Sequence, residues 1–360
     1  MDKKLQQVLY KYGFDPDNCS LEKTGTGLIN HTFLLSTGNK KYILQQINTA
    51  VFKSPELVDE NIAAIGKYIH KNFPGYYFTM PVQSVSGKTQ VEVENSFFRL
   101  FDFVKNCNTF DVVTAPGIAF EAAKQFGRFT KLLKNFPASS LHETIAHFHD
   151  LALRQKQFEQ SLVSGKPERL EKAKELIDGI ILFNWITETF KEHINNKAFK
   201  KRVTHHDTKI SNVLFDQENK GICGIDLDPI MPGFYFSDVG DMMRTYLSPA
   251  GEEERDLEKI EIRDAYFDAI AEGYLSEMQD ELSDAEIYAF YFSGQVMIYM
   301  QALRFLTDYL NGDIYYTVKD EWHNFHRAAN QLQLLKLYSG KKKLYENRIQ
   351  LLLTKKHFTG

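Results

Sequence analysis

The stretch VTHHDTKISNVLFD, residues 203–216, places a histidine, an aspartate and an asparagine between two apolar runs. The strand-like VLF at its end is followed by a turn and a second apolar run, GICGID (221–226). A strand, a turn and a strand in this order predict a β-hairpin. This hairpin would bring Asp226 back beside Asn212, so the sequence gathers carboxylates and an amide at one point of the fold.

The spacing within this stretch indicates a particular chemistry. His205-x-Asp207 is followed by Asn212 five residues beyond the aspartate, which is the H-x-D-x-x-x-x-N spacing of phosphotransferase catalytic loops. We expect Asp207 to accept the proton of an attacking hydroxyl, and Asn212 to offer Mg²⁺ a neutral oxygen beside that base. Asp226 would supply the carboxylate that a hard cation needs. Asp228 lies on the same strand face and is a second candidate for metal or substrate contact.

The histidines leave another interpretation open, because a lone H-x-D is weak evidence in a loop. A metal-dependent hydrolase built on His205, His206 and Asp207 is the alternative, although adjacent side chains diverge and no second histidine pair at ligand spacing follows closely. The segment HETIAHFH also clusters histidines. There, His147 and His149 are two residues apart on a predicted helix and face different sides, so we expect packing or surface roles for them.

The residues before the stretch are rich in β-strand signals. Segment 31–48 holds two β-prone runs joined by a glycine-containing turn, and segment 89–104 alternates apolar and polar residues. Between them, residues 54–73 predict a helix with Ser54 at its N-cap. The first hundred residues therefore predict a small sheet with one helix.

Helical spacing dominates after this part of the chain. It predicts a helix over 116–136, a second over 167–194, and three more after the catalytic loop, one of which begins with a capping-box pattern at Ser283. We therefore predict an α+β chain with two lobes. A β-rich N-lobe would span residues 1–104 and a mainly helical C-lobe residues 105–360, with the active site in the cleft between them.

The composition sets limits on partners and compartment. The chain has 360 residues, 43% of them apolar, and a net charge of only −4, which does not favour nucleic acid or an acidic membrane as a partner. Cys19, Cys107 and Cys223 form no C-x-x-C pair, so a reduced, cytoplasmic compartment is expected. The apolar segment 288–306 is interrupted by polar residues, including Arg304, and predicts a buried helix rather than a membrane span. A monomer or a weak homodimer is expected.

A glycine-containing turn lies upstream, in KTGTGLINHTFLL (23–35). Ahead of the catalytic loop it fits a phosphate-covering turn whose backbone N–H groups face a nucleotide. The residues expected to contact the nucleotide are Gly25, Thr26, Gly27, Gln45, Phe103 and Val104.

The pattern HHDTKISN…IDLD resembles the catalytic loop and metal aspartate of the aminoglycoside phosphotransferase-like kinases, a branch of the protein-kinase-like fold. Longer strings are more similar to the N-acetylhexosamine 1-kinases. The resemblance covers nearly the whole chain, from about residue 25 to residue 316. The strings are YILQQIN (42–48), HETIAHFHD (142–150), VTHHDTKISNVLFD (203–216), IDLDPIMPG (225–233) and LRFLTDYLNGDIYY (303–316).

This resemblance implies a bilobal kinase that uses ATP and Mg²⁺. Asp207 would act as general base on the anomeric C1 hydroxyl of a free N-acetylhexosamine (GlcNAc or GalNAc), and Arg304 and Tyr315 match positions that contact the sugar. Asn212 and Asp226 would hold Mg²⁺. The resemblance further implies a structural role for Asp238, bonded to the catalytic loop, and His205 would brace that loop.

The sequence departs from the family pattern at three positions. Gln45 stands where protein kinases place a strand lysine that pairs with the α- and β-phosphates. Leu28 stands where a polar residue is expected, and Pro229 where a threonine is expected, which removes hydrogen-bonding groups near the sugar. Two alternatives therefore stay open: a kinase of another small hydroxyl compound, such as another sugar or an amino alcohol, and a non-catalytic nucleotide-binding pseudokinase.

Overall fold

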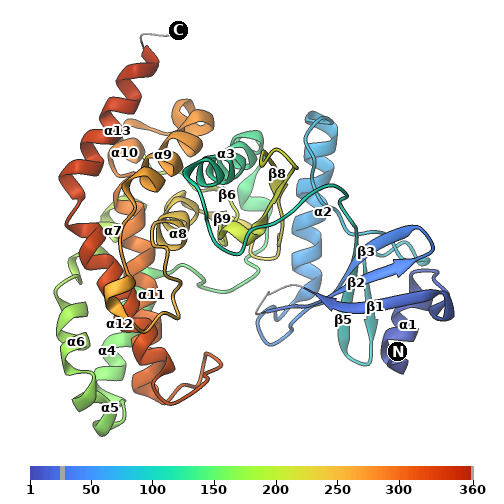
Figure 1. Cartoon of the computed structure of the whole chain (residues 1–360), viewed down its shortest axis with the longest axis horizontal. Helices are drawn as coiled ribbons and strands as arrows, with labels where there is room; N and C mark the ends of the chain where they lie inside the picture. Colours follow the sequence, from blue (N-terminus) through green and yellow to red (C-terminus); the bar gives the residue numbers. More distant parts are fainter. Residues whose placement is uncertain (25–28, 358–360) are drawn as a thin grey trace.

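The computed structural model describes residues 1–24 and 29–357. The turn Gly25-Thr26-Gly27 and Leu28 lie outside the described residues. A sheet of five antiparallel strands occupies one end of the molecule, in the order β1-β2-β3-β5-β4 (Figure 1). Its strands are β1 (Cys19–Thr24), β2 (His31–Thr37), β3 (Lys40–Gln46), β4 (Gln90–Val93) and β5 (Ser96–Asp102). The hairpins predicted within 31–48 and 89–104 are confirmed.

Helix α1 (Lys3–Lys11) covers one face of this sheet, where apolar side chains of β2, β3 and β5 form a buried cluster with it. Helix α2 (Pro55–Asn72) lies between the sheet and the helices that follow (Figure 1). The predicted helix over 54–73 is confirmed, although the Ser54 side chain makes no capping hydrogen bond. We call β1–β5 with α1 and α2 the sheet lobe.

Helix α2 is fastened to the rest of the molecule by its buried face. Val58, Ile62, Ile65 and Ile69 belong to one hydrophobic cluster with residues of α3 and of the strands around the catalytic loop. The Asn61 amide donates to the backbone carbonyls of His142 and Ile230, at 2.9 and 3.0 Å. These contacts fix α2 to the helices.

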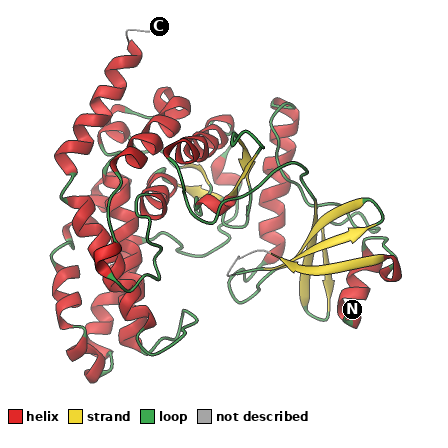
Figure 2. Ribbon diagram, viewed as in Figure 1, coloured by secondary structure: helices red, strands yellow, loops and turns green. Residues whose placement is uncertain are grey.

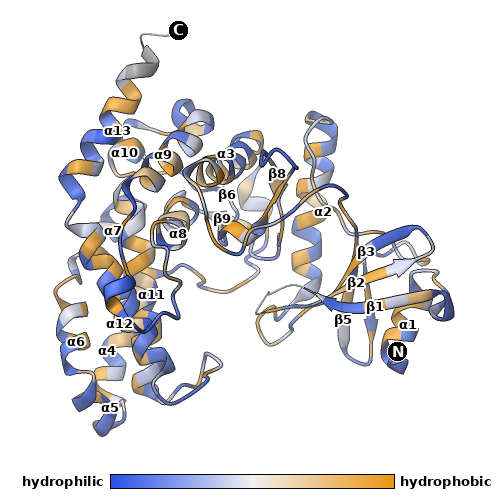
Figure 3. Ribbon diagram, in the orientation of Figure 1, coloured by the Kyte–Doolittle hydropathy of each residue, from blue (hydrophilic) through white to orange (hydrophobic). Residues whose placement is uncertain are grey.

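The remaining helices form the helical lobe, with four short strands (Figure 2). They carry both hydrophobic and hydrophilic residues, as expected of helices with a buried face (Figure 3). The helices are α3 (Pro116–Leu132), α4 (Leu151–Ser164), α5 (Pro167–Lys172), α6 (Lys174–Ile181), α7 (Trp185–Asn195), α8 (Phe236–Tyr246), α9 (Asp264–Met278), α10 (Asp284–Tyr288), α11 (Phe292–Asn311), α12 (His323–Ser339) and α13 (Lys342–His357).

Three helix predictions need correction. Residues 167–194 form three helices, α5 to α7, because the breaks between them let each segment pack its own face on α11. Six α-helices, not three, follow the catalytic loop among the described residues. Segment 142–149 is not helical, since His147 has a φ of 54°, a left-handed conformation that an α-helix cannot contain.

Two other helix predictions are confirmed. Helix α10 begins at Ser283 with both hydrogen bonds of the capping box in place. The apolar segment 288–306 mostly forms α11, the buried helix against which α4, α8 and α12 pack. Among the described residues, no helix combines the length and the apolar character needed to cross a membrane.

The catalytic stretch lies between two small antiparallel sheets. Strand β6 (Arg202–Thr204) pairs with β9 (Met231–Gly233), and β7 (Val213–Phe215) pairs with β8 (Gly221–Gly224). The β7–β8 hairpin confirms the sequence prediction and directs the chain after β8 back toward the loop.

Candidate active site

Two buried aspartates of α8 hold the loop that carries Asp207. The backbone N–H groups of His205 and His206 donate to the two carboxylate oxygens of Asp238, at 3.1 and 2.8 Å. The Thr208 N–H donates to Asp241 Oδ2 at 2.9 Å. The loop backbone on both sides of Asp207 is thereby fixed from behind.

The two histidines of the loop point into the protein. His205 is 1% exposed, and its Nε2 lies 3.0 Å from the Ile225 carbonyl oxygen, which ties the loop to the chain after β8. Burial lowers the pKa of His205 to about 4 and that of His206 to about 3, so both rings are neutral at physiological pH. His206 Nδ1 lies 3.2 Å from His149 Nδ1. These contacts are those of structural residues.

Asp207, Asn212 and Asp226 come together as the hairpin predicted. The Asn212 Nδ2 group donates to the Asp207 carbonyl at 2.9 Å, and the Ile225 N–H donates to the Asn212 carbonyl at 2.8 Å. Asp226 follows directly and has a φ of 61°, an uncommon conformation for a residue other than glycine. The turn after β8 thus places the Asp226 carboxylate beside the loop.

Lys209 is a functional candidate that the sequence analysis did not single out. Its Nζ lies 3.2 Å from Asp207 Oδ2. Burial alone would lower the pKa of Lys209, but the carboxylates of Asp207 and Asp226 outweigh this effect and raise it above its usual value. The sequence could have indicated this residue, because Lys209 lies only two positions after the predicted base in the same short loop.

The residues around Asp226 fit a divalent cation. Burial and the nearby carboxylates of Asp228 and Asp207 raise the pKa of Asp226 to about 7, which indicates too little positive charge at this point. The Asn212 Nδ2 group is used by the Asp207 carbonyl, so its side-chain oxygen remains for a ligand. Mg²⁺ is commonly bound by one or two protein side chains together with substrate phosphates.

The alternative of a metal-dependent hydrolase needs His205, His206 and Asp207 to hold one ion, whereas the rings of His205 and His206 are engaged with the Ile225 carbonyl and with His149. Within residues 1–24 and 29–357, no three His, Cys, Asp or Glu side chains are grouped so as to hold a metal. His206 instead contacts the His149 ring and the backbone near Gly233.

On the sheet side, Gln45 lies on β3 directly opposite Arg99 on β5. The carboxylate of Asp228, which is 0% exposed, pairs with the Arg99 guanidinium and accepts a hydrogen bond from Asn30 Nδ2 at 2.8 Å. These contacts favour a structural tie between the lobes over the substrate contact predicted for Asp228. Phe103 and Val104 directly follow β5, where the chain leaves the sheet.

On the opposite side, Arg304 of α11 lies among aromatic rings. Its guanidinium carbon is 5.8, 5.7 and 5.5 Å from the ring centroids of Phe148, Tyr315 and Tyr316. Phe148 in turn contacts the ring of His206, one residue before Asp207. The predicted sugar residues are therefore linked to the catalytic loop through Phe148, and we call Arg304 with these three rings the aromatic cluster.

The segment that carries Tyr315 is held by a single carboxylate. Asp308, near the end of α11, accepts hydrogen bonds from the backbone N–H groups of Ile314, Tyr315 and Tyr316, at 3.0, 2.8 and 2.9 Å. Asn324 Nδ2 of α12 donates to the same carboxylate at 2.9 Å. Although the Tyr315 side chain is 63% exposed, its backbone is fixed.

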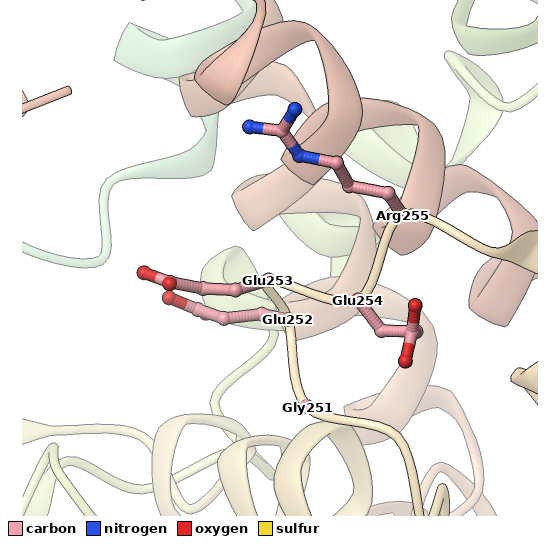
Figure 4. A pocket seen from close by; sticks show the side chains of 5 residues that line it. All are labelled: Gly251, Glu252, Glu253, Glu254 and Arg255. Carbon is pink, nitrogen blue, oxygen red and sulfur yellow. The ribbon is translucent and has the colours of Figure 1, made fainter. Parts of the chain in front are cut away.

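Two hollows lie near or outside this region. One of about 250 Å³ lies behind the loop of Asp207 and is lined by Phe148 of the aromatic cluster together with His149, His206 and Met297. The other, about 720 Å³ and lined by residues 251–255, is an open surface depression that contains none of the predicted site residues. Figure 4 shows its Glu252 and Glu253 side chains pointing the same way. Glu252 there bonds to Arg244 and Arg327, so this carboxylate is already used within the protein.

The comparison with known proteins agrees with this geometry. The model of the phosphotransferase enzyme family, APH, matches residues 20–280. A spectinomycin phosphotransferase solved with ADP and spectinomycin is similar in structure, with a TM-score of 0.60, 12% identity, and 95% of this chain and 98% of that chain covered.

Two further solved structures show the same fold. A microcompartment-associated aminopropanol kinase has a TM-score of 0.60 at 16% identity, with 96% of this chain and 98% of that chain covered. A Plasmodium vivax ethanolamine kinase has a TM-score of 0.58 at 14% identity, with 91% and 87% covered. At such identities the likeness concerns the fold, and the acceptor must be argued from the residues of this chain.

Proposed function

The chain belongs to the phosphotransferase enzyme family, and from this premise we propose that it transfers the γ-phosphoryl group of ATP to the C1 hydroxyl of an N-acetylhexosamine. The family and the fold support a kinase of small molecules with a hydroxyl acceptor. The choice of acceptor rests on the charge around the aromatic cluster.

The observation that carries this choice is that Arg304 has no ion-pair partner among the described residues, whereas Asp150 partly offsets the charge of Arg154 beside it. Arg304 makes a hydrogen bond to Gln301 Oε1 at 3.3 Å and forms no ion pair among the described residues. Arg154 lies nearby and bonds to the His147 carbonyl and to Gln157. Burial and the neighbouring charge of Arg304 lower the pKa of Arg154. Two cations therefore share this region.

This charge discriminates between classes of acceptor. Aromatic rings often surround the cation of an ammonium ligand, but here the Arg304 guanidinium already occupies the space among them. A protonated amino alcohol or aminoglycoside would be repelled by Arg304 and Arg154. An N-acetylhexosamine has no amine charge, and its hydroxyl and carbonyl oxygens accept hydrogen bonds from a guanidinium. The charge therefore supports a neutral acceptor, such as the proposed N-acetylated sugar, over a protonated amine.

The residues around Asp207 support the transfer step. Asp207 would accept the proton of the C1 hydroxyl while that oxygen attacks the γ-phosphorus. Lys209, 3.2 Å from Asp207, would stabilise charge on the transferred group. Mg²⁺ held by Asn212 and Asp226 would neutralise charge on the phosphate oxygens. Most of the rate enhancement would come from positioning and from these charges.

A screen of acceptors that includes one matched pair, N-acetylglucosamine and glucosamine, tests the proposal. ADP release is measured with N-acetylglucosamine, N-acetylgalactosamine, glucose, glucosamine, ethanolamine and choline. We expect the N-acetylated sugars to give the highest kcat/KM, and glucosamine, which differs from N-acetylglucosamine by an amine charge, to be at least about tenfold poorer because of like-charge repulsion. Phosphorus NMR should identify a 1-phosphate. Preferred turnover of ethanolamine or choline would contradict the assignment.

A charge reversal at Arg304 tests the same argument on the protein side. Arg304→Glu should lower kcat/KM for N-acetylglucosamine and shift the preference toward glucosamine, with the KM for MgATP unchanged. Arg304→Gln serves as the matched control, since it removes the charge but keeps a hydrogen-bond donor. If both variants keep the wild-type ratio of the two sugars, the charge of Arg304 does not select the acceptor. The same acceptor screen tests the pseudokinase alternative, which predicts binding of MgATP in calorimetry but no turnover of any acceptor.

A further inference from the structure

The position of the missing strand lysine is occupied by a polar cluster that joins both lobes. Gln45 Oε1 accepts two hydrogen bonds from Arg99, one from Nε at 3.1 Å and one from Nη2 at 2.9 Å. Arg99 is 1% exposed and pairs with Asp228, which is 0% exposed. A guanidinium can only donate, so these bonds determine which end of the Gln45 amide faces it.

The free end of Gln45 is a donor. With its oxygen held by Arg99, its Nε2 group points away from the guanidinium, and within residues 1–24 and 29–357 its one partner is Thr32 Oγ1, at 3.5 Å, the outer limit of a hydrogen bond. Thr32 lies opposite Gln45 on β2, the strand that follows the glycine-containing turn. The amide therefore retains hydrogen-bonding capacity on the side of β2.

The anionic partner of the cluster also differs from the usual kinase arrangement. In protein kinases the strand lysine pairs with a glutamate of the helix that corresponds to α2. Here none of the three acidic residues of that helix forms an ion pair with Arg99 among the described residues. Asp59 accepts a hydrogen bond from Thr89, and Glu60 lies against His142. Burial raises the pKa of Asp59, although Asp59 is close enough to Arg99 for the Arg99 charge to oppose this larger effect. The carboxylate for Arg99 comes instead from Asp228, two residues after the metal aspartate.

We propose that Arg99 is the positioning residue for nucleotide binding and replaces the missing lysine through Gln45. Arg99 orients the Gln45 amide so that its N–H groups bind the phosphate oxygens of the nucleotide, and the pair with Asp228 keeps the metal-binding turn in register with the sheet. Asp228 also holds Asn30, whose oxygen accepts from the Asn48 N–H at 3.0 Å. The inference rests on the proposed use of ATP but does not depend on the identity of the acceptor.

The affinity for MgADP, measured in the absence of an acceptor by competition with a fluorescent nucleotide analogue, tests this role. Gln45→Met leaves the Arg99–Asp228 pair intact and should weaken binding about tenfold, the loss expected for one hydrogen bond to a charged group. Arg99→Lys keeps a cation for Asp228 but cannot hold the Gln45 oxygen with two donors. It should still bind MgADP about as weakly as Gln45→Met, and its thermal midpoint, compared with that of Arg202→Lys, shows how much stability the exchange itself removes.

The double variant and a control complete the experiment. Because Arg99 acts through Gln45, the Gln45→Met/Arg99→Lys variant should bind no more weakly than either single variant. Arg202→Lys, at the buried Arg202–Glu286 pair of the helical lobe, should leave binding unchanged. Wild-type binding by Arg99→Lys, or additive losses in the double variant, would overturn the inference alone. Absence of MgADP binding by the wild type would overturn the proposed function as well.

Discussion

Asp207 stands on a backbone that is fixed from behind by Asp238 and Asp241, so its side chain can be changed without moving the loop. Asp207→Asn keeps the size of the side chain and removes its basicity, together with the negative charge that faces Lys209. We expect kcat to fall by roughly 10²–10⁴-fold, the usual contribution of a general base. Calorimetry should show MgATP binding close to that of the wild type. Asp178→Asn, at an exposed helix position, is the control.

Near-normal turnover by Asp207→Asn would assign the proton transfer to another group or to water. Measurement of kcat for Lys209→Met would then separate charge stabilisation from base catalysis. The carboxylates beside Lys209 raise its pKa, so the amine stays protonated and cannot accept a proton.

His205 gives a pH-dependent prediction. Its pKa is lowered by burial to about 4, whereas an unfolded histidine titrates near 6.5. Between these values the unfolded chain binds more protons, so the stability falls as the pH falls, by about 3 kcal/mol from this residue. Burial raises the pKa of Asp238 to about 7, so the contribution of Asp238 to stability rises as the pH falls, opposite to that of His205. The comparison of His205→Gln with wild type therefore isolates the histidine.

Thermal midpoints of both proteins from pH 7 to pH 4 check this expectation. His205→Gln should lose less stability over this range than the wild type, although it starts lower because its contact with the Ile225 carbonyl is altered. If the two proteins lose stability in parallel as the pH falls, the pKa of His205 is not lowered in the folded protein.

For individual residues, the sequence predicted contacts between positions that are close in the chain and missed contacts that join the two lobes. The loop spacing placed Asp207 and Asn212 together, and the hairpin signal added Asp226. Nothing in the sequence indicates that Asp228 pairs with Arg99, because this contact depends on how the sheet lies against the helical lobe. The roles of these residues in catalysis and binding stay predictions.

Among the elements, the end of α11 matters most for the acceptor. Asp308→Asn replaces a carboxylate that accepts three backbone N–H bonds by an amide with one oxygen, so the segment with Tyr315 should lose its fixed position. We expect the KM for N-acetylglucosamine to rise about tenfold and the KM for MgATP to stay unchanged. Steady-state kinetics with each substrate varied in turn gives this comparison.

Asp178→Asn is again the matched control, since it makes the same change on an exposed helix surface. If Asp308→Asn raises both KM values in parallel, Asp308 supports the fold as a whole rather than the acceptor segment. An unchanged KM for the sugar would remove the Tyr315 segment from the proposed site.

The elements themselves were predicted where local signals are strong. The capping box at Ser283 and the hairpin within 31–48 were both found from sequence. The single helix over 167–194 was wrong because three short helices follow the curved surface of α11, a constraint that comes from tertiary packing. The helix over 142–149 was wrong because the left-handed backbone at His147 leaves no trace in the residue pattern.

At the scale of the whole molecule, we expect nucleotide binding to stabilise both lobes together. Asp226 on the helical side and Gln45 on the sheet side would contact one ligand, so MgADP at about 100 times its dissociation constant should add about 2.7 kcal/mol to the stability. Differential scanning calorimetry should show one transition that moves upward. Asp226→Asn should abolish the part of the shift that depends on Mg²⁺. Two transitions, of which only one moves, would contradict this expectation.

The two-lobed architecture was predicted from a change in the spacing of apolar residues along the sequence, from the alternation typical of strands to the spacing typical of helices. The boundary placed at residue 104 stays a prediction, since α2 belongs to the sheet lobe in sequence but packs against the helices with its buried face. Such sharing of one helix between two units is decided by packing.

The way α8 holds the catalytic loop has a consequence for how such enzymes diverge. Asp238 and Asp241 fix the loop through its backbone, whereas the proposed acceptor region is built from α11 and the segment after it. Substitutions that change acceptor recognition therefore need not disturb the reacting groups. Exchange of α11 and the segment after it would then alter the recognition surface while Asp238 and Asp241 still hold the loop.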